Sequence, residues 1–275
     1  ATNAEVRAII DSGVTFADIF DENQDATQAT CTGDYHWVST RDSSGECLRV
    51  KSGQEKAAAF LETSRYADIM GATVEFDKME GITHDPDSNT MYLAMSRVRK
   101  EMSDGEGDVS VPFNRCGTVY ELDLDANYEA TNMAGLVSGV PLYYRQGALT
   151  EKPYPAPYTD NQCSLQGISE PDNITYMPGY DTLIIGEDTG QHQNDMIWAL
   201  NLDETHPEYM ELTRIQTTPY GSETTSPYFY PNINGFGYMM SVIQHPFGES
   251  DQDKLMVEDE AKGYTGYIGP FPAMD

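Results

Sequence analysis

The stretch that decides the fold is EGITHDPDSNTMYLAMSRV, residues 80–98. It begins with an acidic residue, continues as a short strand, turns at Pro86 among Asp and Asn residues, and ends in an apolar strand. Two later stretches repeat this order: EPDNITYMPGYDTLIIGED, residues 170–188, and ETTSPYFYPNINGFGYMMSVIQHP, residues 223–246. Pro, Asp, Asn and Gly between two apolar runs are typical of β-hairpins. We therefore expect three similar hairpins.

A further strand follows two of these hairpins. GTVYELDLD, residues 117–125, and DMIWALNLD, residues 195–203, share an aromatic residue, two Leu residues and a closing Asp. A hairpin plus a strand, repeated around an axis, forms the blades of a β-propeller. Long polar loops separate the repeats, for example residues 98–115 and 150–162. The sequence predicts an all-β chain in which residues 1–275 form a single propeller unit or the C-terminal portion of one.

One short helix is expected near residues 53–70. Ser52 and Glu55 have the spacing of a capping box. The apolar residues of QEKAAAFLETSRYADIM, residues 54–70, can share one helical face, and Gly71 stands where a left-handed residue often ends a helix.

The charge of the chain excludes some partners. Asp and Glu number 45 against 16 Lys and Arg, a formal net charge of -29. Such a chain is repelled by nucleic acid and by anionic membranes, whereas divalent cations would neutralise part of its charge. Solvation in a salty environment is the alternative reason for the acidity. The chain has no apolar run of membrane-spanning length, and ATNAEVRAII does not read as a signal peptide, so a secretion signal was either removed or never present.

Four cysteines allow three pairings: Cys31, Cys47, Cys116 and Cys163. A Cys31–Cys47 bond would close a short polar loop, and a Cys116–Cys163 bond would then tie two later segments together. The even number favours an oxidising compartment. Four buried free thiols are the alternative.

Carboxylates near the starts of the three hairpins are the candidate metal ligands. Glu80, Asp172 and Glu223 hold nearly equivalent places, and Asn173 adds an amide oxygen. The ends of inner propeller strands converge on a central channel, and calcium takes six to eight oxygen ligands. Alternatively, these residues only start strands or cap turns.

The sequence leaves the role of two further acidic residues undecided and assigns a histidine a structural role. Glu187 and Asp188, in GEDTG, could point into the channel or lie in a turn. His245, in QHP, is expected to make a structural hydrogen bond.

Three segments together resemble the PhoX family of secreted alkaline phosphatases. SRYADIMGATVEFDKMEGITHDPDSNTMYLAMS is similar to the family's helix followed by an R-P-E-G or K-M-E-G motif. SEPDNITYMPGYDTLIIGED resembles its P-[ED]-N segment, and ETTSPYFYPNINGFGYMMSVIQHPFGES its E-x-T-x-P-x-F-x-P-D-G segment with the Q-H-P motif. The segments occur in the family's order and span roughly residues 50 to 250.

The resemblance implies part of a six-bladed propeller, located in the periplasm or outside the cell, that hydrolyses phosphate esters at a site holding Ca²⁺ and Fe³⁺. It implies Glu80 and Asp172 as metal ligands with Asn173 close by, and Glu223 as a further ligand. Lys78 stands where the family often has Arg, and would contact phosphate.

The resemblance covers only the later part of the family pattern, because the family's T-C-E-E-N segment does not occur here. A companion chain or an N-terminal half would then complete the propeller. Glu170, two residues before Asp172, stands where a basic group is expected. The alternative function is a non-catalytic, extracellular, calcium-binding propeller with a structural or assembly role.

Overall fold

The computed structural model describes residues 1–275 apart from 41–44, 106–108, 143–153, 159, 249–251 and 275. The polar loops expected at 98–115 and 150–162 lie partly outside the described residues. The chain forms two compact units: residues 1–76 with 105–110, and residues 77–104 with 111–275. A single propeller unit over residues 1–275 stays a prediction.

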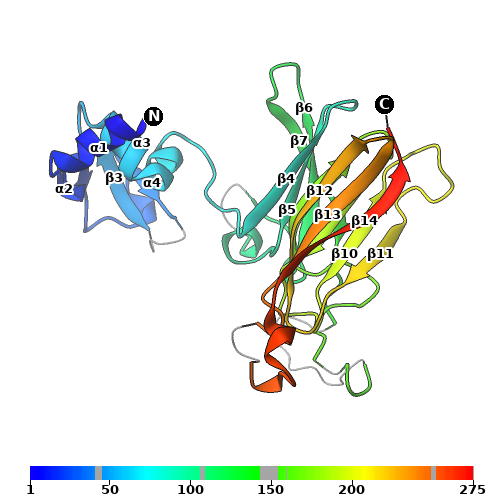
Figure 1. Cartoon of the computed structure of the whole chain (residues 1–275). Helices are drawn as coiled ribbons and strands as arrows, with labels where there is room; N and C mark the ends of the chain where they lie inside the picture. The colour runs from blue at the N-terminus through cyan, green and yellow to red at the C-terminus, as the bar shows by residue number, and fades with distance from the viewer. Residues whose placement is uncertain (41–44, 106–108, 143–153, 159, 249–251, 275) are drawn as a thin grey trace. The chain divides into compact units, whose positions relative to one another are not determined.

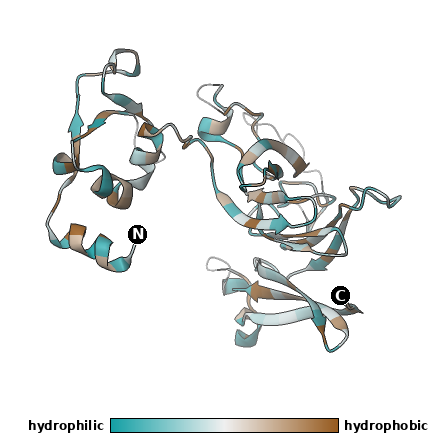
Figure 2. Ribbon diagram, turned by 90° about the horizontal axis from the view of Figure 1, so that it is seen from above, coloured by the Kyte–Doolittle hydropathy of each residue, from teal (hydrophilic) through white to brown (hydrophobic). Residues whose placement is uncertain are grey.

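The described residues of the first unit form four α-helices, one 3-10 helix (Gln28–Thr30) and a small antiparallel sheet of order β1-β3-β2. Its elements are α1 (Asn3–Asp11), α2 (Phe16–Ile19), β1 (Phe20–Glu22), β2 (His36–Val38), β3 (Glu46–Val50), α3 (Glu55–Leu61) and α4 (Thr63–Ile69). Its core packs Ile19, Phe20, Val38 and Leu48 against Ala58. Hydrophobic and hydrophilic segments follow one another along α1, near the N label of Figure 2.

The helix expected near residues 53–70 is two helices. Glu62, with φ −129° and ψ 45°, ends α3 and precedes α4. The capping box of Ser52 and Glu55 is wrong, because Gln54 is the N-cap and no side chain caps the helix. Gly71 does adopt the expected left-handed conformation, with φ 86°. Helix α1 was not expected, although Thr2 and Glu5 form a capping box there.

The described residues of the second unit form three antiparallel sheets, and Figure 1 labels strands of each of them. The first is β4 (Met79–Asp85), β5 (Thr90–Met95), β6 (Thr118–Leu124) and β7 (Ala130–Ser138). The second is β8 (Pro171–Met177), β9 (Thr182–Glu187), β10 (Met196–Asn201) and β11 (Leu212–Thr217). The third is β12 (Glu223–Ile233), β13 (Phe236–Gln244) and β14 (Tyr264–Pro272).

The three predicted hairpins are confirmed as β4–β5, β8–β9 and β12–β13, and the two following strands as β6 and β10. The first strands of the three sheets, β4, β8 and β12, contact one another in that order. The chain is rich in antiparallel sheet as expected, and a closed propeller stays a prediction.

In the middle sheet, strands β9 and β10 are buried on both faces, whereas the edge strand β11 is largely exposed. On β9, Leu183 and Ile185 pack in a core shared with Tyr92 of the first sheet. The intervening Ile184 packs in a second core with Met239 of the third sheet. Successive strand residues point to opposite faces, so the uninterrupted apolar runs of β9 and β10 supply both cores.

Each first strand is interrupted by an irregular register close to its start. The pairing shifts between Met79 and Ile82 in β4, between Pro171 and Ile174 in β8, and again between Thr225 and Tyr228 in β12. Such bulges re-aim side chains and are frequent beside active sites. The skipped residues are Glu80 with Gly81, Asp172 with Asn173, and Ser226 with Pro227.

Of the three pairings that the sequence allowed, the structure contains Cys31–Cys47 in the first unit and Cys116–Cys163 in the second, and no cysteine is a free thiol. Among the described residues, no helix has the length and apolarity needed to cross a membrane.

Candidate functional site

The starts of β4, β8 and β12 and the end of β9 bring the candidate residues together. Glu80 and Asp172 lie in the bulges of β4 and β8, at equivalent places. Glu223 is different, because it is the first residue of β12 and pairs with Gln244 three positions before the bulge of that strand. Asp188 directly follows β9.

Glycine allows these strand starts to lie close together. A Cβ atom at Gly81 would collide with the backbone of Asp172 and Ile174, and one at Gly186 would lie 2.7 Å from Oγ1 of Thr224. The first contact joins β4 to β8, and the second joins β9 to β12. Close approach of backbones is a recurrent reason for glycine within a strand.

Three carboxylates form the centre of the site. Asp172, Asp188 and Glu223 each present an oxygen within 4.8 Å of the oxygens of the other two. Asp172 is buried, and the other two are partly buried. The structure thus brings together two of the expected ligands, Asp172 and Glu223, and adds Asp188. From the sequence, Asp188 could have lain either in a turn or in the site. Its position directly after an apolar strand was the sequence feature that could have identified it as a site residue.

Lys78 and Glu80 lie beside this carboxylate cluster. Lys78 Nζ is 3.3 Å from Glu80 Oε1 and 3.4 Å from Asp188 Oδ2. Burial lowers the pKa of Lys78, but the charges of Asp188 and Glu80 outweigh it, so the pKa is raised overall. The ammonium group therefore stays charged between the carboxylates.

Asn173 forms hydrogen bonds through both the nitrogen and the oxygen of its side-chain amide. Its Nδ2 donates to Asp172 Oδ1 at 2.6 Å, and its Oδ1 accepts from the backbone N–H of Ser226 at 2.6 Å. The amide oxygen predicted to face a metal is engaged by β12 in this structure. Asn173 therefore connects β8 to β12 at the bulge of each strand.

The acidity of two cluster carboxyls is perturbed by burial and by their neighbours. Burial raises the pKa of Asp172 to about 6, with a further rise from the charge of Glu80 and an opposing hydrogen bond from Asn173. Burial also raises the pKa of Glu223, the charge of Asp188 adds to this, and His245 opposes it. His245 Nε2 lies 3.0 Å from Glu223 Oε2, the structural contact expected for this histidine. Crowded negative charge of this kind favours a bound cation.

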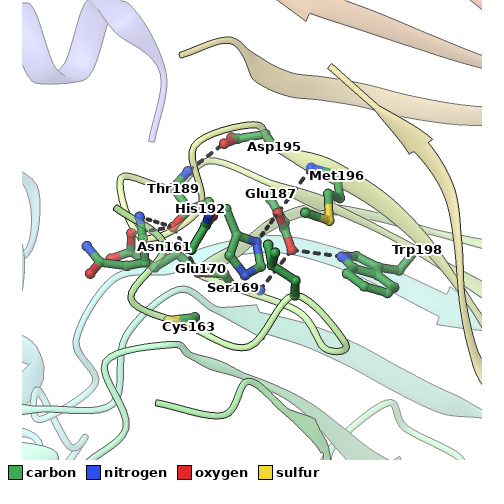
Figure 3. Close-up of polar contacts among 12 residues, drawn as sticks. Asn161, Cys163, Ser169, Glu170, Glu187, Thr189, His192, Asp195, Met196 and Trp198 are labelled. Atoms are coloured by element: carbon green, nitrogen blue, oxygen red, sulfur yellow. Dashed lines mark hydrogen bonds and ion pairs between the residues drawn. The ribbon is translucent and has the colours of Figure 1, made fainter. Parts of the chain in front are cut away.

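Glu187, next to Asp188, is fully buried and anchors the end of β9 (Figure 3). Its Oε1 accepts from Trp198 Nε1 at 2.7 Å and from Ser169 N–H at 2.9 Å. Its Oε2 accepts from Met196 N–H and lies 3.0 Å from His192 Nδ1. With all these partners in place, the backbone that carries Asp188 is fixed.

His192 and Asp195 complete this buried network. His192 Nε2 lies 3.2 Å from the carbonyl oxygen of Ser164. The imidazole ring of His192 therefore lies between the carboxylate of Glu187 and this carbonyl oxygen. Asp195 accepts from Thr189 N–H at 3.0 Å, and burial followed by the charge of Glu187 raises its pKa well above the usual range.

Neither a protein-family model nor a curated protein matches the chain. A solved structure of similar fold is PhoX from Pseudomonas fluorescens in complex with vanadate, a transition-state analogue. The TM-score is 0.50 at 18% sequence identity, over 77% of this chain and 36% of that one. The likeness is one of fold, it spans a minor part of the PhoX chain, and it confirms the resemblance expected from the motifs.

Proposed function

We propose that this chain, which shares the fold of part of PhoX, belongs to a metal-dependent phosphomonoesterase that acts on phosphate esters. The observation that carries the proposal is the convergence of Asp172, Asp188 and Glu223 at the starts of neighbouring sheets. Two disulfides accord with a periplasmic or extracellular location.

The donor set fits calcium. Carboxylate oxygens are hard ligands of the kind that Ca²⁺ prefers. The raised pKa values of Asp172 and Glu223 reflect negative charge that a cation would relieve. The three clustered ligands of the described chain are all carboxylates, and the proposal of Fe³⁺ as a second metal rests on the family resemblance.

Each residue of the cluster has a proposed role. Asp172, Asp188 and Glu223 would hold the cation, with Glu80 as a further ligand and Asn173 holding Asp172 in place. When bound, the cation would polarise the phosphoryl group and neutralise its developing charge. Lys78 places its ammonium beside the carboxylates, where it would pair with a phosphate oxygen of the substrate.

The second candidate function is a non-catalytic calcium-binding scaffold. The observation that favours it is the position of Lys78, whose ammonium already pairs with Glu80 and Asp188. A six-bladed propeller completed by an N-terminal half or a companion chain remains part of both proposals.

Hydrolysis of p-nitrophenyl phosphate by the full protein, with calcium and with EDTA, separates the two candidates. We expect turnover that EDTA abolishes and calcium restores, with calcium and iron content measured by mass spectrometry. Asp188→Asn should lower calcium affinity about tenfold or more, because a ligand is lost.

The matched control is Asp87→Asn, an exposed carboxylate in the turn between β4 and β5. It should leave calcium affinity and turnover unchanged. Calcium binding without chelator-sensitive turnover would support the scaffold, and the absence of both would overturn the metal site itself.

A further inference from the structure

A polar pocket of about 410 Å³ lies in the same unit as the carboxylate cluster. Its lining includes Arg97, Arg99, Phe113, Arg115, Glu170 and Gly190. We call it the arginine pocket. The chain has only 16 Lys and Arg residues and a net charge of -29. Three arginines around one cavity therefore make this part of an acidic protein locally positive. Pockets of this size hold small molecules.

Two of the arginines are held by ion pairs. Arg97 Nε lies 2.8 Å from Oε1 of Glu170, and Arg99 Nε lies 2.8 Å from Oδ2 of the buried Asp77. Side chains fixed in this way lose little conformational freedom when a ligand binds. Arg115 adjoins Cys116, whose carbonyl accepts from the backbone N–H of Glu170 at 2.8 Å.

Positive charge predominates in the pocket. Among its described lining residues, Glu170 is the only carboxylate, and it also accepts from Thr189 Oγ1 and from Gly190 N–H. Burial lowers the pKa of the Arg115 guanidinium, and so do the charges of Arg99 and Arg97, against the opposing charge of Glu170. Three arginines that line one pocket repel one another through their positive charges. An oxyanion would relieve this repulsion, since the planar guanidinium matches phosphate and carboxylate oxygens.

The pocket adjoins the carboxylate cluster through shared backbone. Glu170 is two residues before Asp172, and the carbonyl of Glu170 accepts from the N–H of Asp188 at 3.3 Å. One loop carries Asp188 into the cluster and Gly190 to the pocket wall. Glu170, which stands where the family resemblance implies a basic group, is paired with Arg97.

We propose that the arginine pocket binds a second oxyanion of the substrate, a phosphate or carboxylate group carried by the same phosphate ester that the carboxylate cluster acts on. The substrate class is thus phosphate esters with a second anionic group. This rests on the proposed function for the ester, whereas anion binding by the pocket does not require catalysis.

The first test measures anion binding without catalysis. The full chain, stripped of metal with EDTA, is titrated with inorganic phosphate by calorimetry. Without metal the negative charge of the carboxylate cluster repels phosphate, and Lys78 is paired with Glu80 and Asp188, so binding reports the arginine pocket. We expect Arg115→Gln to weaken binding about tenfold or more, because a charge-assisted contact is lost. Arg115→Lys should retain part of the affinity.

The matched control is Arg214→Gln on β11, where Arg214 lies over the ring of Trp198, outside the pocket. It should bind phosphate like the wild type. If Arg115→Gln does not fold, the double variant Arg99→Gln with Asp77→Asn removes a whole ion pair and should weaken binding likewise. No phosphate binding by the wild type, or equal binding by folded pocket variants, would overturn the proposal.

The second test uses the calcium-loaded protein with fructose 1,6-bisphosphate, 3-phosphoglycerate and p-nitrophenyl phosphate. Arg115→Gln should lower kcat/KM for the first two substrates about tenfold more than for the third, and the larger of the two effects identifies phosphate or carboxylate as the second group. Equal losses on all three substrates would overturn the substrate role. No turnover of any substrate, with phosphate binding intact, would reject the phosphatase and leave the anion pocket standing.

Discussion

Asp172 makes the carboxylate cluster sensitive to pH. Its pKa is raised to about 6, because the side chain is buried and lies near Glu80. A raised pKa means that the fold prefers the protonated carboxyl. That contribution to stability is complete below the unfolded pKa of about 4 and is lost as the pH rises through about 6. Calcium requires the ionised form, so protons compete with it below that value.

We therefore expect the calcium affinity of the full chain to fall by up to about tenfold per pH unit below pH 6. Calorimetric titrations with calcium between pH 4.5 and 7.5 measure this slope. Asp172→Asn should bind calcium more weakly at neutral pH and show a shallower slope. A wild-type affinity that does not change between pH 5 and 7 would contradict the assignment.

Glu187 is the residue on which the position of Asp188 depends. Its carboxylate accepts from Trp198 and from two backbone N–H groups, and it lies beside the His192 ring. Glu187→Gln replaces an accepting oxygen with a donating amide and removes the negative charge. We expect the free energy of unfolding to fall by about 3–5 kcal/mol, as for other broken buried pairs.

Urea unfolding followed by tryptophan fluorescence measures this loss. The chain has two tryptophans, and Trp37 lies in the first unit. A Trp37→Phe background makes Trp198 the reporter of the second unit. Glu208→Gln, at an exposed turn, is the control and should leave the transition unchanged. A Glu187→Gln transition that matches the parent would show that the network does not stabilise this unit.

At the scale of elements, bulges near the starts of β4, β8 and β12 shape the site. The hairpins themselves follow from turn residues between apolar runs, which is why all three were predicted. The bulges were not, since they depend on how each strand meets its partner. They place Glu80 and Asp172 at equivalent positions and leave Glu223 at a different one.

Gly81 tests the contact between β4 and β8. A methyl group there would collide with the backbone of Asp172 and Ile174, so Gly81→Ala must push the two strands apart. We expect a loss of about 1–3 kcal/mol in the free energy of unfolding, typical of overpacking, together with weaker calcium binding.

Gly266→Ala on β14 is the matched control, because a Cβ atom there meets nothing within 4 Å. It should leave thermal stability and calcium affinity near the wild-type values. If Gly81→Ala behaves like this control, the close approach of the two strands is not required for the site.

For the whole molecule, the three sheets explain why the ligands can converge. Strand β9 of the middle sheet is buried on both faces, and each neighbouring sheet contributes to the core on one of them. This stacking brings the starts of β4, β8 and β12 together. The likeness to PhoX covers only 36% of that chain. The proposed phosphatase activity is therefore to be assayed with the full protein.

From the sequence alone, the hairpins, the strands that follow them and two of the three clustered carboxylates, Asp172 and Glu223, could be predicted. These follow from local rules, namely turn chemistry and the alternation of apolar residues. The cysteines allowed three pairings, and the fold selected Cys31–Cys47 and Cys116–Cys163. The sequence did not show that Asp188 lies in the cluster with Asp172, or that the amide oxygen of Asn173 accepts a hydrogen bond from β12. Nor did it show that three arginines line one pocket. Those outcomes depend on bulges and on contacts between sheets, which join residues far apart in the chain and leave no periodic pattern along it.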